Sequence, residues 1–391
     1  MDSGYRLLAA KYIRRQAKQL ASQLEGVRAA EDIEFVHRAR VATRRLRAAL
    51  RMFDDCFTRK QVRRWRKAVR RTAAKLGNAR DRDVQIELLC GTLSTLNTRE
   101  CFPGISRILV QLERERERLQ RKVVRAVDRI EADGVLREMQ RVTRKALRGA
   151  ESWAENVQNP AAYVCTERQI LRQLDELLRH QGSLANPDDR EGHHAMRIAA
   201  KRLRYTLEIA RPVHPGRLEE FVEAIKRVQS LLGDVHDCDV WGNHLDAFAS
   251  KERRRITSLF GHAGRLAHLQ AGIDYLREDR RRHRREVFGQ LVEYWAELGK
   301  GRLWESLTRV VLARGDLGVS PLPLGEGTCL GTFSDRPLPA VVPTPQSAEA
   351  TSASPTVEPK LWVAESETRL RNDGTNGGRQ SDSKPLLTTG S

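Results

Sequence analysis

The sequence is poor in aromatic residues and has no long apolar run. Phe, Trp and Tyr together make up 5% of its 391 residues. No stretch approaches the roughly 18 consecutive apolar residues expected of a membrane-spanning helix. The N-terminus, "MDSGYRLLAAKYIRRQ", has four apolar residues in a row before charges follow, which excludes a secretory signal peptide. These absences favour a cytoplasmic protein.

The spacing of the cysteines is not that of a metal site or a set of disulfide bonds. None of the six belongs to a Cys-x-x-Cys pair, so the sequence predicts neither a zinc site nor a disulfide framework, and a reducing compartment fits best. No glycine-rich phosphate loop, Ser/His/Asp arrangement or activated cysteine stands out. We therefore expect no metal, no cofactor and no catalytic residue.

Proline is sparse in most of the chain, because nine of the 14 prolines lie beyond residue 320. From Asp316 onward there are six Lys or Arg and nine Asp or Glu, a net charge of −3, and the composition predicts a disordered tail over residues 316–391. Since the whole chain carries a formal charge of +19, residues 1–315 carry +22. Such an excess favours a polyanionic partner, which could be nucleic acid, anionic lipid or polymeric phosphate.

Apolar residues before the tail recur at spacings of three and four, as in "ERQILRQLDELLRH" and "REVFGQLVEYWAEL". No convincing strand alternation accompanies them, so the sequence predicts an all-α body. Glycine and proline signals predict breaks between helices near Gly26, Gly77, Pro103, Gly149 to Pro160, Asn186 to Pro187, Pro212 to Gly216, Gly233 and Gly301.

Two blocks of sequence recur within this body. The first block is His37-x-x-Arg40-Val41-x-x-Arg44-Arg45-Leu46-Arg47, and it returns as His194-x-x-Arg197-Ile198-x-x-Lys201-Arg202-Leu203-Arg204. The second block, "AVRRTAAKLGNARDRDV" from residue 68, returns as "AIKRVQSLLGDVHDCDV" from residue 224. The offset is 157 residues for the first block and 156 for the second. We therefore predict an internal repeat of two similar multi-helix halves, related by a pseudo-twofold axis.

The first block gathers cations on one face of a helix. At about 100° per residue, one arc holds only basic side chains and the opposite arc is apolar. The basic arc contains His37, Arg40, Arg44, Arg47 and Arg51, and the apolar arc contains Ala39, Leu46, Leu50 and Phe53. In the second copy the basic arc contains His194, Arg197, Lys201 and Arg204, and the apolar arc contains Leu203, Leu207 and Ala210. Glu208 stands at the counterpart of Arg51, a local loss of positive charge.

A linear polyanion would match this arc. Consecutive cations rise about 5 Å apart along the helix axis, and Arg binds phosphates bidentately while Lys acts as a point charge. The alternative is a solvated helix face, but such faces usually mix signs because like charges three or four residues apart repel. For His37 and His194 an anion would favour the imidazolium form, the alternative being a neutral histidine bonded to a neighbouring helix. A further cationic row could extend the surface through Arg63, Arg66, Arg70 and Lys226.

Nucleic acid is one alternative ligand. Single-strand binders interleave aromatic with basic residues so that bases can stack. The first cationic arc has no aromatic residue, and the second has only Tyr205 beside it. This pattern favours a polyanion without bases, with low-specificity nucleic-acid binding kept as the alternative.

A metal-dependent phosphohydrolase is a second alternative. The dipeptide His236-Asp237 resembles that of all-helical phosphohydrolases, with further candidate ligands at His193, His194, His214 and His244. The matching pair in the first half is Arg80-Asp81, which keeps an acid but not metal-ligand chemistry. We expect the aspartates of these blocks to cap the helices after Gly77 and Gly233, or to pair with arginines of the basic faces. They are Asp81, Asp83, Asp237 and Asp239.

The two pairs of blocks resemble the conserved histidine α-helical domain family, the CHAD domain, over roughly residues 5–310. The resemblance implies two antiparallel helical bundles, a basic central cavity or groove that binds inorganic polyphosphate, and association with polyphosphate granules. It places at the binding surface His37, Arg40, Arg44, Arg45, Arg47, His194, Arg197, Lys201, Arg202 and Arg204, with Arg70 and Lys226 from the following helices. The helical wheel adds Arg51.

The expected organisation is a CHAD-like helical domain over residues 1–315, with halves of about 1–150 and 160–315, followed by the tail. Many relatives join this domain to a tunnel-type triphosphatase domain, and no such domain precedes it here. The glutamates of "LERERERLQRK" superficially match the E-x-E-x-K motif of that domain, but they have helical surroundings and are typical of a salt-bridged solvent face. We therefore expect a non-enzymatic polyphosphate-binding protein, cytoplasmic and granule-associated.

Overall fold

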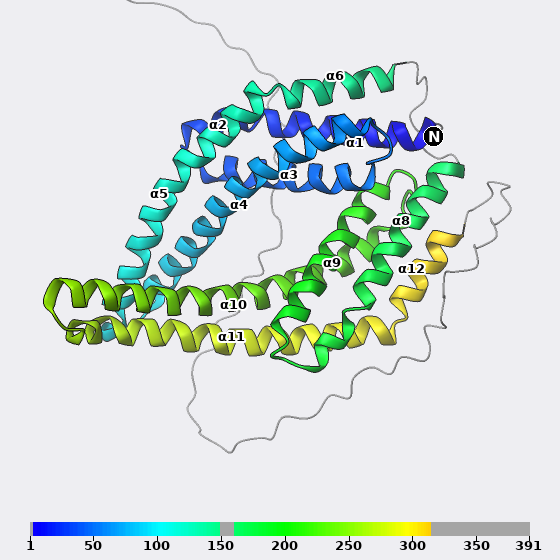
Figure 1. The fold of residues 1–391 in the computed structure, drawn as a ribbon. Coiled ribbons are helices and arrows are strands. Elements are labelled where there is room, and N and C mark those ends of the chain that lie inside the picture. The colour runs from blue at the N-terminus through cyan, green and yellow to red at the C-terminus, as the bar shows by residue number, and fades with distance from the viewer. Residues whose placement is uncertain (1–2, 149–159, 314–391) are drawn as a thin grey trace, which may run out of the picture. The chain divides into compact units, whose positions relative to one another are not determined.

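The computed structural model describes residues 3–148 and 160–313, and every regular element in these ranges is a helix (Figure 1). This confirms the predicted all-α body. The predicted disordered tail, residues 316–391, lies outside the described residues. Among the described helices, none combines the length and the hydropathy that crossing a lipid bilayer requires.

The first group of helices, before residue 149, is α1 (Ser3–Ala21), α2 (Leu24–Ala29), α3 (Ile33–Met52), α4 (Arg59–Thr95), η1 (Arg99–Cys101), α5 (Phe102–Ala132) and α6 (Val135–Leu147). The second group, from residue 160, is α8 (Pro160–Leu178), η2 (Gln181–Ala185), α9 (Arg190–Ala210), α10 (Glu219–Phe260), η3 (Gly264–Leu266), α11 (Ala267–Lys300) and α12 (Leu303–Leu312).

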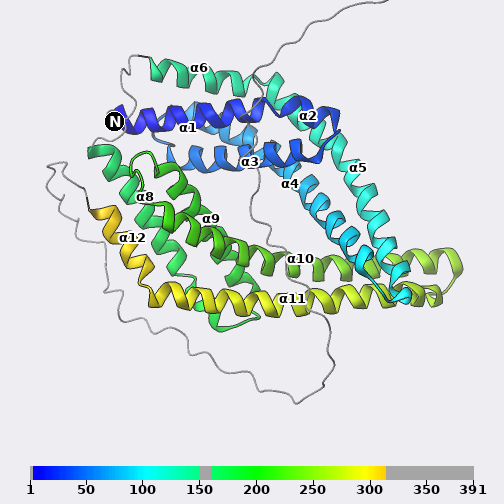
Figure 2. The ribbon, with the colours of Figure 1, turned by 180° about the vertical axis from the view of Figure 1, so that it is seen from behind.

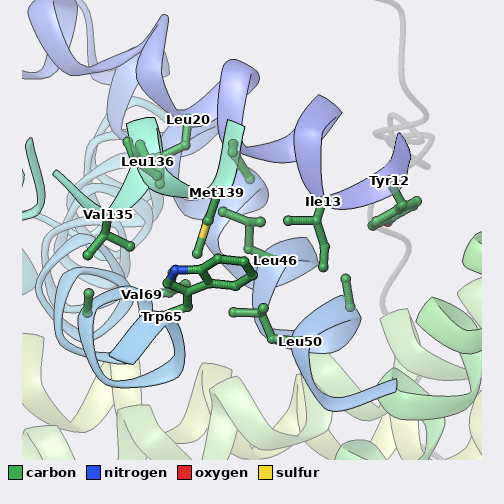
Figure 3. Close-up of a cluster of buried hydrophobic side chains, with 14 of the residues drawn as sticks. Tyr12, Ile13, Leu20, Leu46, Leu50, Trp65, Val69, Val135, Leu136 and Met139 are labelled. Atoms are coloured by element: carbon green, nitrogen blue, oxygen red, sulfur yellow. The ribbon is translucent and has the colours of Figure 1, made fainter. Parts of the chain in front are cut away.

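The first group packs around an apolar core in which α1 contacts both α3 and α6. Figure 3 shows Trp65 of α4 lying against Leu46 and Leu50 of α3, with Met139 of α6 on its other side. All of these side chains are buried. Burial of each large apolar side chain contributes about 1.5–3 kcal/mol, so the apolar arc of α3 is held firmly inside this core.

The second group has its own core, formed by α8, α9, α10, α11 and α12. Leu203 and Leu207 of α9 are fully buried in it, and Trp295 of α11 packs on Trp304 of α12 with ring centroids 5.3 Å apart. The apolar arcs of α3 and α9 are therefore both buried, as the helical wheels predict. Their cationic arcs face away from these cores.

Two long hairpins, α4–α5 and α10–α11, extend from these groups (Figures 1 and 2). A third apolar cluster joins them and includes Leu89, Ile105, Trp241 and Leu276. The start of α5 approaches α11 so closely that a Cβ atom built on Gly272 would clash with the carbonyl oxygen of Cys101. The two halves of the chain are thus packed against each other at this crossing.

The predicted helix breaks at Gly77 and Gly233 are wrong, since these residues lie inside α4 and α10. A helical glycine costs about 0.5–1 kcal/mol relative to alanine, and the tertiary packing of these two long helices outweighs that cost. A Cβ atom at Gly77 would lie 3.9 Å from Nε of Arg40, and one at Gly233 would lie 3.9 Å from Nε of Arg197. These are ordinary van der Waals distances, so each glycine lies next to an arginine of the neighbouring basic helix and an alanine would also fit.

The other predicted breaks fall close to observed helix ends, except that the break predicted at Gly26 lies a few residues earlier in the chain. Pro103 lies in the first turn of α5, Pro187 precedes α9, and Gly301 separates α11 from α12. Gly26 lies inside the short α2, and the chain breaks just before that helix instead. Most of the break predicted over Gly149 to Pro160 lies outside the described residues.

The close approach between α5 and α11 predicts how substitutions of glycine in α11 change the free energy of unfolding. We expect Gly272→Ala to lower the free energy of unfolding by about 1–3 kcal/mol, because the added methyl group must push two helix backbones apart. Gly289→Ala, in the same helix but with nothing within 4 Å of the added Cβ, should raise it by about 0.5–1 kcal/mol. Urea unfolding followed by circular dichroism measures both, and equal stability of the two variants would contradict the tight crossing.

Candidate functional site

The cationic arcs of α3 and α9 are positioned by the starts of these two helices and by their buried arcs. Asp32 caps α3 by accepting a hydrogen bond from the backbone N–H of Glu34, and Asp189 caps α9 by accepting one from Gly192. The helices contact each other. Side chains that project from their unburied faces can therefore meet.

Cations from both helices meet around Lys201. Burial lowers the pKa of Lys201 to about 8, and the charges of Arg197, Arg44 and Arg40 act in the same direction. Arg40 and Arg44 belong to α3, whereas Lys201 and Arg197 belong to α9. The structure thus brings the central residues of the two basic blocks onto one shared surface.

Tyr205 of α9 lies between arginines of the two helices. The guanidinium carbon of Arg44 is 5.7 Å from the centroid of its ring, and that of Arg204 is 5.9 Å from it. These distances lie within the range of cation–π attraction. Burial lowers the pKa of Arg44, while the other arginines add to the effect. Tyr205 therefore helps to hold two like charges close together, a role that its place beside the arc did not reveal.

Several buried side-chain nitrogens on this surface lack a hydrogen-bond partner. They are His37 Nδ1, Arg44 Nε, Arg80 Nη1 and Arg202 Nε. Leaving a buried polar atom unsatisfied costs about 1–3 kcal/mol. Each of these arginine nitrogens is a donor to which an anionic oxygen could bind.

Two arginines of the basic arcs are paired with aspartates of the second block. Arg40 lies 3.4 Å from Asp81, and Arg197 lies 3.9 Å from Asp237. Both aspartate side chains are about 60% exposed (61% and 62%), so each pair contributes little stability and mainly orients its arginine. The prediction that aspartates of the second block pair with arginines of the basic arcs is confirmed for Asp81 and Asp237.

The other two aspartates of the block hold the long hairpins together. Asp83 accepts a 2.5 Å hydrogen bond from Arg116 of α5, and Asp239 accepts one of 2.8 Å from Arg284 of α11. The prediction that these residues cap helices is wrong, because all four aspartates lie in the interior of α4 or α10. The helices continue through the glycines before them, so no helix begins there.

Glu208 is the acidic residue that lies between the two basic helices. Its carboxylate is 2.8 Å from Nε of Arg204, one turn earlier on α9, and 3.7 Å from Nε of Arg45 on α3. The Glu208 side chain is only 13% exposed. Sequence reasoning recognised a loss of charge here but not that the carboxylate neutralises arginines from both helices.

The remaining predicted site residues fall into two groups. In the described residues no ion pair involves Arg47, Arg51, Arg70, Lys201 or Arg202. Lys226, in contrast, lies 3.2 Å from Glu223 on the same exposed stretch of α10. Arg66, of the predicted cationic row, is also occupied, since it donates a 2.7 Å hydrogen bond to the carbonyl oxygen of Leu50 and pairs with Asp54.

The sequence profile of the CHAD domain matches residues 11–246 of the chain, which include both copies of both blocks. The chain belongs to the CHAD domain family. Among solved structures, the CHAD domain from the plant Ricinus communis is 21% identical, covers 72% of this chain and 93% of its own, and superposes with a TM-score of 0.49. PptA from Streptomyces chartreusis is 15% identical, covers 74% and 98%, and gives a TM-score of 0.48. A comparison with curated proteins gave no match.

The histidines of this CHAD domain occupy two kinds of environment. His194 lies on the cationic surface, with its Nδ1 3.3 Å from Nδ1 of His236 on α10. Burial lowers the pKa of His236 to about 4, with Arg197 and His194 adding to the effect. His193 and His214 are instead buried and bonded to Ser183 and Thr166.

These contacts bear on the metal-site alternative. Two of the candidate ligands, His193 and His214, already have hydrogen-bond partners inside the core. In the part of the chain that the structure describes, no group of three or more His, Cys, Asp or Glu side chains is arranged to hold a metal ion. The pair His194 and His236 has Arg197 and Lys201 near it, and Asp239 is also near His236.

The environment of Lys201 predicts a change of stability with pH. Its pKa is about 8 in the fold and 10.5 in the ordinary reference state, so between these values the unfolded chain binds more protons and stability rises with pH. We expect Lys201→Gln to be more stable than the parent at pH 7, with a gap that shrinks as the pH passes 8. Thermal unfolding from pH 7 to 9.5, in buffers without phosphate, measures the gap. A constant gap would refute this assignment.

Proposed function

We propose that this CHAD domain binds inorganic polyphosphate on the shared cationic surface of α3 and α9, without catalysis, and that this binding recruits the protein to polyphosphate granules in the cytoplasm. The family is associated with polyphosphate binding. The observation that carries the proposal is the meeting of cations from α3 and α9, with Lys201 near Arg40 and Arg44 and the guanidinium of Arg44 5.7 Å from the ring of Tyr205 on α9. A chain of phosphates supplies both the negative charges and the acceptor oxygens that this surface lacks.

The surroundings of Tyr205 favour polyphosphate over nucleic acid. Its side chain is 4% exposed, and its ring is approached by Arg44 and Arg204. A base needs an accessible aromatic face on which to stack. The ring of Tyr205 therefore contacts arginines and is not accessible for a nucleic-acid base to stack on it.

The pairing of the carboxylates supports a binding role without catalysis. Asp81 and Asp237 are each paired with an arginine of the basic arcs, and Glu208 is paired with two. In each pair the carboxylate oxygens are directed at a guanidinium group. These groups are therefore better suited to orienting arginines than to acting as general bases.

The first test is a double charge reversal at the centre of the surface. We expect Arg44→Glu with Lys201→Glu to raise the Kd for long-chain polyphosphate at least about 100-fold, because two charge-assisted contacts of about 1.5 kcal/mol each are lost. Arg121→Glu with Arg254→Glu, exposed residues of α5 and α10, changes the net charge equally and should leave the Kd nearly unchanged. Isothermal titration calorimetry measures the affinity, and circular dichroism checks folding.

Equal affinities of the two double variants would remove the proposed site. The same samples, supplemented with a divalent metal, should release no phosphate from polyphosphate. Release that is lost in His236→Ala would instead support the phosphohydrolase alternative.

Competition separates polyphosphate from nucleic acid. We expect long-chain polyphosphate to displace single-stranded RNA from the protein at equal phosphate concentration and physiological salt, because the surface offers closely spaced cations without accessible aromatic faces. Fluorescence anisotropy of a labelled RNA measures the displacement. Retention of the RNA under these conditions would favour a nucleic-acid-binding function.

A further inference from the structure

The two basic blocks differ in the sign of charge at a single aligned position. With the offset of 157 residues, Arg45 corresponds to Arg202 and Arg47 corresponds to Arg204. Arg51, however, corresponds to Glu208. One block thus has a carboxylate where the other has a third guanidinium.

In the second block this carboxylate fills a position between two guanidiniums. Glu208 lies 2.8 Å from Nε of Arg204 and 3.7 Å from Nε of Arg45, so it joins one arginine from each basic helix. The side chains of Glu208 and Arg204 are mostly buried, at 13% and 17% exposure. The protein therefore provides its own oxyanion at this place.

In the first block the equivalent residue, Arg51, has three other arginines near it. Partial burial lowers the pKa of Arg51, and the charges of Arg202, Arg47 and Arg66 act in the same direction. Arg202 also has a buried Nε without a hydrogen-bond partner. Arg66 already pairs with Asp54 on this side, 3.2 Å away. The group around Glu208 consists of Glu208, Arg204 and Arg45, and its equivalent in the other half consists of Arg51, Arg47 and Arg202. This equivalent group contains no carboxylate.

We propose that Arg47, Arg51 and Arg202 form an oxyanion subsite for one phosphate group of the bound polyphosphate, and that the Glu208 carboxylate permanently occupies the matching subsite in the other half. This inference rests on the function proposed above. A guanidinium binds carboxylate and phosphate oxygens with the same planar arrangement of donors, so the contacts of Glu208 indicate how a phosphate is held between Arg51 and Arg202. The polyphosphate site is then closed at one end and open at the other.

Two substitutions with opposite expected effects test this inference. Arg51→Glu should raise the Kd for polyphosphate at least about tenfold, because its carboxylate closes the open subsite, and should raise the unfolding temperature of the ligand-free protein by relieving repulsion. Glu208→Gln should lower the Kd and lower the ligand-free unfolding temperature, because it frees Arg45 and Arg204. The control is Arg254→Glu, an exposed residue of α10 that changes the net charge as Arg51→Glu does.

A charge swap provides the matched rescue. Arg51→Glu combined with Glu208→Arg keeps the net charge and moves the closed subsite to the other half, so its Kd should return to within about twofold of the parent's. A Kd for Arg51→Glu equal to that of Arg254→Glu, or a swap as weak as Arg51→Glu alone, would overturn the subsite while leaving polyphosphate binding intact. A parent protein that binds no polyphosphate would instead overturn the proposed function and the subsite together.

Discussion

Electrostatic repulsion between the cationic faces of α3 and α9 is the constraint on which the rest of this structure depends. The fold holds these faces together because the opposite faces of the same helices are buried in two separate apolar cores. The long hairpins add a third apolar cluster where they cross. The lowered pKa of Lys201 shows that gathering half-buried cations is unfavourable, but the two cores bury many large apolar side chains, each of which contributes about 1.5–3 kcal/mol. Packing therefore prevails, and the cations remain together.

Sequence reasoning predicts those parts of this arrangement that lie within one helix. The spacing of Leu46 and Leu50 predicts which face of α3 is buried, and the positions of Arg40 and Arg44 predict the cationic face. The helices at Gly77 and Gly233 were not predictable in this way, because α4 and α10 continue through these residues while packed against other helices. Local signals favour a break there, and tertiary packing overrides them.

Contacts between the two halves were likewise beyond sequence reasoning. The pattern identifies Glu208 as a departure from the repeat, but nothing in it says that the carboxylate reaches Arg45, whose position is 163 residues earlier in the chain. Tyr205 is visible as an aromatic residue beside the arc, yet its position between Arg44 and Arg204 depends on how α3 and α9 meet. Membership of the CHAD domain family and this meeting of charges together support the polyphosphate proposal.

Proton uptake on binding tests the central claim most directly. Burial lowers the pKa of Lys201 to about 8, and the charges of Arg197, Arg44 and Arg40 add to the effect. If a polyanion neutralises these cations, its binding must raise that pKa and draw protons from solution near pH 8. Calorimetric titration with long-chain polyphosphate at pH 8, repeated in buffers of different ionisation enthalpy, gives the number of protons taken up. Uptake by the parent protein that disappears in Lys201→Arg is the expected result. Binding without any exchange of protons would show that the phosphates attach elsewhere.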